Sequence, residues 1–174
     1  MTGIILKYFT AILFVLIFVS CQPSQEPQKP KPYTKKQLDS LVVDMEQKYN
    51  RMEEDRIRDY ISRHIPMQKS QMGYWYAITQ KNPDGKPIGE SSLVKYTRVV
   101  SLCNSKELYN DQIILKIGNG NEISGMHEAL KMLRKGEKAL FIFPSYLAHG
   151  LLGDMNKVPP KSELIYEVNI LDVQ

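Results

Sequence analysis

Few residues in this chain have the types and spacing that catalysis or metal binding requires. The three histidines, His64, His127 and His149, lie far apart and lack the spaced carboxylates or thiols of a ligand set, so we predict no metal site and no cofactor. No Gly-x-Ser-x-Gly motif occurs that would place a serine nucleophile on a sharp turn. Cys103 is expected to be a small buried hydrophobic side chain rather than a nucleophile. We therefore expect the chain to act without covalent catalysis.

Cys21 is a candidate for another chemistry, covalent lipid attachment. Residues 9–19 form an apolar run that follows Lys7 and ends at Ser20 and Cys21. The run has the length of a signal peptide and is short for a membrane span. A small residue directly before a cysteine resembles the lipobox of bacterial lipoproteins. We predict that residues 1–20 are a lipoprotein signal peptide and that Cys21 is acylated; plain cleavage and an uncleaved anchor are the alternatives.

A lipid on Cys21 would anchor the protein outside the cytoplasm, on a bacterial membrane. Gln22 follows the cysteine in place of the aspartate that marks inner-membrane retention in some bacteria, which favours the periplasmic face of the outer membrane. Residues 22–32 contain four prolines among polar residues. Residues 21–33 are therefore predicted to be a disordered tether.

The composition is that of a globular protein. The chain has 174 residues, of which 43% are hydrophobic and 24% are charged. Its net charge of +4 comes from 23 basic and 19 acidic residues that are interspersed along the chain. Because a nucleic-acid-binding protein usually clusters its basic residues, nucleic acid is not an expected partner.

Residues 34–66 have the periodicity of a helix. Leu38, Val42, Met45 and Tyr49 recur at spacings of four and three residues, and Pro66 ends the pattern. This apolar stripe could pack on the following domain or on a second copy of the chain, so self-association is left open.

From residue 73 onward the pattern is mainly that of strands. Strands are predicted at residues 74–78, 93–102, 113–117, 139–143 and 164–171, and one short helix at residues 124–134. We predict an α+β fold, in which an antiparallel sheet of residues 73–174 wraps around the short helix and the N-terminal helix precedes it.

Three linked motifs resemble those of FKBP-type peptidyl-prolyl cis-trans isomerases. Residues 123–139 are similar to the family's central helix and following strand, residues 143–150 to its proline-to-Ala-Tyr-Gly loop, and residues 158–168 to its double-proline turn and last strand. Upstream, residues 94–97 resemble the strand that carries a pocket tyrosine. The resemblance covers roughly residues 74–173 and implies an FKBP-like fold.

A narrower resemblance concerns the N-terminal half as well. The lipobox, the helical segment, and the motifs at residues 73–76 and 143–148 are similar to those of the gliding-motility-associated lipoproteins of Bacteroidetes.

An FKBP-type site isomerises an X-Pro peptide bond, whose rotation barrier of about 18–20 kcal/mol comes from amide resonance. An apolar pocket lowers this barrier because removing water disfavours the planar amide, which is more polar than the twisted one. The resemblance implies that the catalytic residues are Tyr96, Ile123 through its backbone N–H, His149 and Tyr166. The substrate-binding residues that it implies are Leu108, Tyr109, Ile113, Glu122, Met126 and Val158. The alternative is that the apolar positions among these simply fill the core.

Three positions depart from the family pattern. Met126 stands where the family usually has the tryptophan of the pocket floor, Tyr109 where it has an aspartate, and His149 where it has a tyrosine. Methionine is softer than an indole, so we expect a less rigid grip on the proline ring. These differences bear on turnover more than on the fold.

We therefore expect a peptidyl-prolyl isomerase that acts on proline-containing polypeptide clients, namely exported proteins, at the extracytoplasmic membrane surface. The alternative is a catalytically weak FKBP-like binding module in a gliding or secretion complex.

Overall fold

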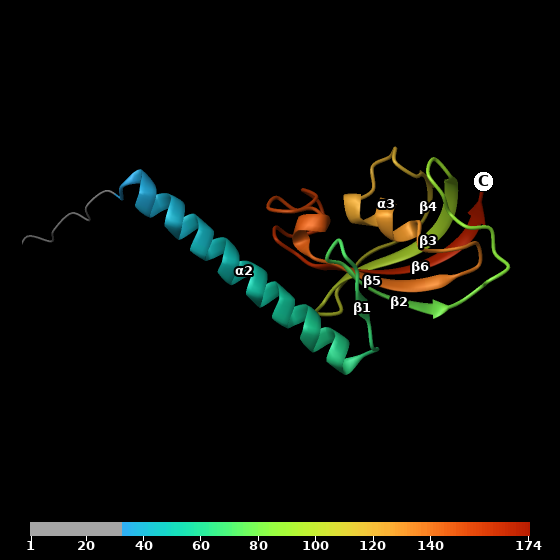
Figure 1. The fold of residues 1–174 in the computed structure, drawn as a ribbon, viewed down its shortest axis with the longest axis horizontal. Coiled ribbons are helices and arrows are strands. Elements are labelled where there is room, and N and C mark those ends of the chain that lie inside the picture. Colours follow the sequence, from blue (N-terminus) through green and yellow to red (C-terminus); the bar gives the residue numbers. More distant parts are fainter. Residues whose placement is uncertain (1–32) are drawn as a thin grey trace, which may run out of the picture. The chain divides into compact units, whose positions relative to one another are not determined.

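The structure is a computed structural model that describes residues 33–174 (Figure 1). The predicted signal peptide, Cys21 and nearly all of the predicted tether lie outside these residues. The chain divides into two compact units, residues 1–41 and 42–174, with the boundary inside helix α2. In the first unit, the described residues are the start of this helix, where Leu38 and Leu41 are exposed.

Helix α2 (Lys35–Arg63) is one continuous helix, which confirms the helical periodicity of this region. Thr34 and Gln37 begin it with reciprocal hydrogen bonds. The N–H of Thr34 donates to Oε1 of Gln37 at 2.9 Å, and the N–H of Gln37 donates to Oγ1 of Thr34 at 3.4 Å. This arrangement satisfies backbone donors that the first turn leaves unpaired.

The described residues of the second unit form a six-stranded antiparallel sheet in the order β1-β2-β5-β6-β3-β4. Its strands are β1 (Gln68–Lys69), β2 (Trp75–Gln80), β3 (Leu93–Leu102), β4 (Glu107–Lys116), β5 (Lys138–Phe143) and β6 (Leu164–Val173). A short helix, α3 (Ser124–Leu130), lies between β4 and β5, and a 3-10 turn, η2 (Ser145–Leu147), follows β5. The predicted α+β architecture is confirmed.

Two predicted element boundaries were wrong by four residues or more. Strand β4 begins at Glu107 rather than at residue 113, since its first half also pairs with β3, for example Tyr109 opposite Val100. Helix α3 ends at Leu130 rather than at residue 134, because the next residues form tighter i to i−3 bonds and Gly136 then takes a positive φ of 83°.

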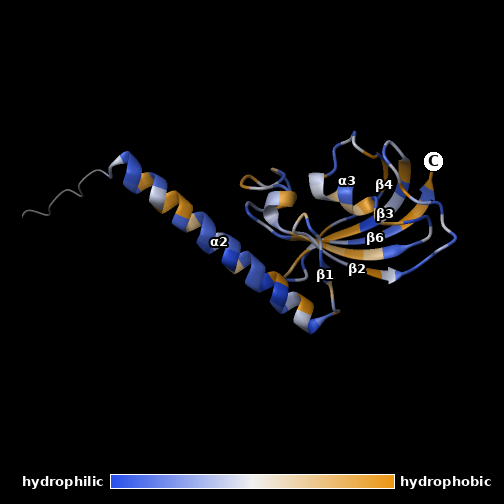
Figure 2. Ribbon diagram, in the orientation of Figure 1, coloured by the Kyte–Doolittle hydropathy of each residue, from blue (hydrophilic) through white to orange (hydrophobic). Residues whose placement is uncertain are grey.

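The two faces of the sheet carry separate hydrophobic cores, because successive side chains of a strand point to opposite faces. On one face, Phe141 of β5 and Tyr166 of β6 belong to a core that includes Met126 of α3. On the other face, Ile142 of β5 belongs to a second cluster that includes Ile57 of α2. The second half of α2 is therefore part of the hydrophobic packing of residues 42–174. Figure 2 shows hydrophobic residues throughout the strands, whereas hydrophilic residues predominate along α2.

None of the helices within residues 33–174 combines the length and the apolar character that crossing a membrane requires.

Candidate functional site

A cavity of about 210 Å³ lies on the α3 side of the sheet. This volume is below the roughly 300–1,000 Å³ of sites for drug-sized ligands, so it suits a group the size of one side chain rather than a large cofactor. Its walls come from β3, β4, the segment before α3, the loop after η2, and β6. The lining residues are Arg98, Val100, Tyr109, Asn121, Glu122, Ile123, His149, Asp154, Val158, Leu164 and Tyr166.

The cavity brings together a part of the predicted site. The predicted residues that line it are Tyr109, Glu122, Ile123, His149, Val158 and Tyr166. Tyr96, Leu108 and Met126 do not line it, because their side chains are buried in the adjoining core, and Ile113 packs against the same core. The sequence-based picture of a broader pocket with Met126 as its floor therefore does not describe this cavity.

Tyr166 forms an aromatic wall of the cavity. It is buried, and the ring of Phe143 meets it edge-on with centroids 5.4 Å apart. Burial raises the pKa of Tyr166, and the nearby charge of Glu122 raises it further, so the phenol stays protonated. Because side chains alternate along β6, Tyr166 shares a face with Leu164 and Val168, and all three belong to the same core.

A half-buried arginine, Arg98, also lines the cavity, with its guanidinium carbon 6.0 Å from the centroid of the Tyr166 ring. Its side chain is 13% exposed; its Nε donates to Oδ1 of Asp111 at 2.7 Å, and its Nη1 donates to Glu122. Burial lowers the pKa of Arg98, but the hydrogen bond to Asp111 and the charge of Glu122 outweigh burial and raise it overall. Sequence reasoning missed Arg98. Strand alternation could have found it, because Arg98 lies two residues after the inward-facing Tyr96.

Glu122 is the carboxylate partner of Arg98 in the cavity wall. Burial raises its pKa, although the charge and the hydrogen bond of Arg98 oppose this shift. Its second oxygen, Oε2, is buried and has no hydrogen-bond partner among the described residues. The hydroxyl of Tyr96 is in the same situation. Both groups are therefore costly to keep in the fold, since an unpaired buried polar group loses its hydration without compensation.

Asp154 accepts the hydrogen bonds that hold the loop in the cavity wall. Its Oδ1 accepts the N–H groups of Asn156 at 2.9 Å and Val158 at 2.7 Å, and its Oδ2 accepts the hydroxyl of Tyr109. Burial raises the pKa of Asp154, but these hydrogen bonds together outweigh it and lower the pKa to about 2. Sequence reasoning missed Asp154, since no local pattern pairs it with Tyr109. Position 109, where the family pattern has an aspartate, is a tyrosine here, and its hydroxyl donates to the carboxylate of Asp154.

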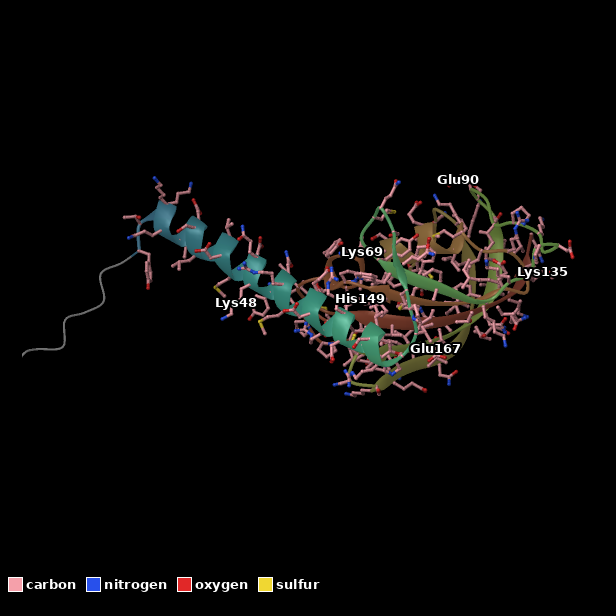
Figure 3. All side chains as sticks on the ribbon, turned by 60° about the horizontal axis from the view of Figure 1, so that its bottom comes forward. Lys48, Lys69, Glu90, Lys135, His149 and Glu167 are labelled. Atoms are coloured by element: carbon pink, nitrogen blue, oxygen red, sulfur yellow. The ribbon has the colours of Figure 1, made fainter. Side chains whose placement is uncertain are left out.

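His149 enters the cavity wall from the loop between η2 and β6, and it is labelled in Figure 3 together with Glu167 of β6. Backbone hydrogen bonds shape this loop around it. The N–H of Gly150 donates to the carbonyl of Ser145 at 2.8 Å, and the N–H of Lys161 donates to the carbonyl of Gly150 at 2.8 Å. The loop therefore closes on itself just after His149.

Ile123 lines the cavity at the start of α3. Its carbonyl accepts the N–H of Met126 at 3.0 Å, and none of the hydrogen bonds of the described residues uses its own N–H. That N–H is thus a donor without a protein acceptor among residues 33–174.

The other reactive side chains carry no sign of catalysis. Within residues 33–174, no group of three or more His, Cys, Asp or Glu side chains is arranged to hold a metal ion. Cys103 is half-buried beside the second core, and burial raises the pKa of its thiol to about 12. A thiol with such a pKa is a poor nucleophile.

Comparisons with known sequences place the chain in a family. The sequence profile described as "FKBP-type peptidyl-prolyl cis-trans isomerase" matches residues 85–171. A probable FKBP-type peptidyl-prolyl cis-trans isomerase of Haemophilus influenzae is 27% identical over 130 residues, which are 70% of this chain and 51% of that protein. The inactive peptidyl-prolyl cis-trans isomerase FKBP6 of Mus musculus is 34% identical over 59 residues, which are 34% of this chain and 18% of that protein. The chain spans about half or less of the length of these relatives.

Solved structures show the same fold. FkpA from Escherichia coli superposes with a TM-score of 0.60 and 21% identity, over 82% of this chain and 74% of that one. A peptidyl-prolyl cis-trans isomerase from Pseudomonas syringae pv. tomato superposes with a TM-score of 0.63 and 18% identity, over 74% of this chain and 95% of that one. Since the family profile extends over half of the sequence and these folds agree with it, the chain belongs to the FKBP-type peptidyl-prolyl cis-trans isomerase family.

Proposed function

We propose that the protein is a peptidyl-prolyl cis-trans isomerase that acts on X-Pro bonds of polypeptide clients outside the cytoplasm. The observation that carries this proposal is the cavity in which Tyr166 and Val158 form apolar walls beside the unpaired N–H of Ile123. A proline ring would enter between these walls, and its neighbouring carbonyl would accept the Ile123 N–H.

The proposed reaction needs no nucleophile, metal or cofactor from the protein. Enclosing the X-Pro bond removes water, which disfavours the polar planar amide relative to the twisted one. The Ile123 N–H fixes the carbonyl on one side of the bond while the rest of the chain rotates. His149 lines the edge of the same cavity and would contact the client chain there.

The test is an isomerisation assay on a proline tetrapeptide with the purified full chain. We expect a cis-to-trans rate above the uncatalysed rate that grows in proportion to protein concentration. A rate that stays at background, with circular dichroism showing folded protein, would overturn the proposal.

A binding module that does not isomerise is the second candidate. It is favoured by Met126, which replaces the expected pocket tryptophan and lies wholly in the core, and by the small size of the cavity. In such a module the cavity would hold a proline-containing segment of a partner in a surface assembly, such as a gliding or secretion complex. Binding of the tetrapeptide, measured by calorimetry, without any gain in isomerisation rate would identify this function.

Membrane attachment is a separate proposal that is based on the sequence before residue 33. We propose that Cys21 carries lipid and holds the protein at the periplasmic face of the outer membrane. Cys21→Ala should then move the protein from the membrane fraction to the soluble fraction. If this variant stays with the membranes after a high-salt wash, the lipid is not the anchor.

A further inference from the structure

Helix α2 contacts the first residue of the loop that forms one wall of the cavity. The N–H of Ser145 donates to Oε1 of Glu53 at 2.7 Å. Glu53 is 6% exposed, which is rare for a carboxylate in the second half of a helix that is otherwise charged and solvated. This contact fixes the position at which the chain leaves β5.

The same helix contacts the last residue before β6. Arg56 lies one turn after Glu53, and its Nε and Nη2 donate to the two carboxylate oxygens of Glu163 at 2.7 and 2.9 Å. Glu163 is buried, and the parallel pair of hydrogen bonds fixes its direction as well as its distance. Both ends of the segment 145–163 are thus held by one turn of α2.

The residues of this segment that line the cavity lie between the two contacts. They are His149, Asp154 and Val158. Hydrogen bonds from Gly150 to Ser145 and from Lys161 to Gly150 connect both ends of the segment to its middle. A shift at Ser145 or Glu163 would therefore reach the backbone beside His149.

Attaching a helix to a sheet through buried charged groups costs free energy, because these groups lose their hydration. Burial raises the pKa of Glu53, and the hydrogen bond from Ser145 opposes this shift only in part, while the charge of Glu163 adds to it. Apolar packing would suffice to cover the sheet, as Ile57 does one residue after Arg56. Because Glu53 and Arg56 make directed polar contacts at both ends of the loop, we infer that they fix the position of the loop as well as attach the helix.

We propose that Glu53 and Arg56 are positioning residues of the isomerase site, which hold the 145–163 segment so that His149 and Val158 keep their places in the cavity wall. This inference rests on the proposed function. It makes α2, which precedes the segment matched by the family profile, a working part of the site.

The test compares variants of the full chain in the tetrapeptide assay. Glu53→Ala should lower kcat/KM by about ten- to hundredfold, mainly through a higher KM, because small displacements of site residues are costly. Glu53→Gln should recover most of this loss, since its amide oxygen can still accept the Ser145 N–H. Arg56→Ala should behave like Glu53→Ala. Glu54→Ala is the matched control, because Glu54 pairs with Arg58 and Lys69 and not with the loop.

Amide hydrogen exchange separates positioning from mere stability. In Glu53→Ala, exchange should rise in residues 145–163 and stay unchanged in α3. Unchanged KM and kcat in both alanine variants would overturn the proposal, even if exchange rises. A Glu53→Gln variant whose kcat/KM is no higher than that of Glu53→Ala would also overturn it. If the wild type does not isomerise at all, the proposed function fails, and the affinity for the tetrapeptide becomes the readout. Equal affinity in wild type and Glu53→Ala, or no binding by the wild type, then overturns the positioning role too.

Discussion

The hydroxyl of Tyr109, on β4, donates a hydrogen bond to the carboxylate of Asp154, in the loop before β6. This bond joins the wall that β4 contributes to the cavity with the wall that the loop contributes. The amino group of Lys157 lies 4.8 Å from the centroid of the Tyr109 ring and donates to the carbonyl of Leu108 at 2.9 Å, so the same loop contacts β4 a second time. The edge of the sheet and the loop therefore hold each other in place.

Asp154 should make stability depend on acid pH. Its folded pKa of about 2 is below the ordinary value of 3.8, so the ionised form stabilises the folded protein. This contribution is complete above about pH 4 and is lost as the pH falls towards 2. We expect the melting temperature of Asp154→Asn to be lower than that of the wild type at pH 5, with a difference that shrinks between about pH 4 and 2. A difference that is constant over this range would contradict the role of the ionised carboxylate.

Tyr166 should be needed for both proline binding and turnover. Tyr166→Ala removes an aromatic wall and should lower kcat/KM by about ten- to hundredfold, since an unsupported substrate is badly placed. Tyr166→Phe keeps the ring and should stay close to wild type. Because truncation of a buried aromatic residue costs about 3–5 kcal/mol of stability, circular dichroism must show that the alanine variant is folded. Wild-type activity in folded Tyr166→Ala would place the site elsewhere.

Introducing the family's tryptophan at position 126 should destabilise this protein. Met126 is 0% exposed and lies in the core on the α3 side of the sheet, so the larger indole of a tryptophan would have to displace its neighbours. Met126→Trp should lower the free energy of unfolding by about 1–3 kcal/mol, as overpacked cores usually do. Urea denaturation measures this change, with Met126→Leu as a control of similar volume that should cost less. A Met126→Trp variant as stable as wild type would mean that the core yields and opens towards the cavity.

The second half of α2 should contribute to folding, and its first half should not. Ile57 is 1% exposed, whereas Leu38 is 53% exposed. Ile57→Ala should therefore reduce the free energy of unfolding by about 2–5 kcal/mol, and Leu38→Ala should leave it nearly unchanged. Urea denaturation measures both changes, and equal effects of the two substitutions would contradict this prediction. A deletion of residues 34–64 should by the same reasoning expose Leu140, Ile142 and Ile165 to solvent.

The sequence predicted the elements that have a regular pattern and missed those that do not. Strand β3 alternates cleanly, and its predicted bounds, residues 93–102, are those of the structure. The first half of β4, residues 107–111, has one buried side chain, Leu108, among exposed charged and amide residues at the edge of the sheet, so no regular alternation marks it as a strand. Within the candidate site, apolar and aromatic positions such as Tyr166 could be assigned to a face. Asp154 could not, because its partner Tyr109 is distant in the sequence and only the folded loop brings them together.

The order of the two cores along the chain has a consequence for how the protein reaches its folded state. Helix α2 is made before any strand, yet many of the groups that it contacts lie in β5, β6 and the segment between them, which are made last; Arg56 and Glu163 are 107 positions apart. Contacts between such distant residues form slowly, because the chain must first lose the entropy of a long loop. We therefore expect the α2 face to close late in folding, after the hairpin of β3 and β4 and the packing of α3. Until then, the chain would itself display an apolar sheet face of the kind that folding helpers recognise.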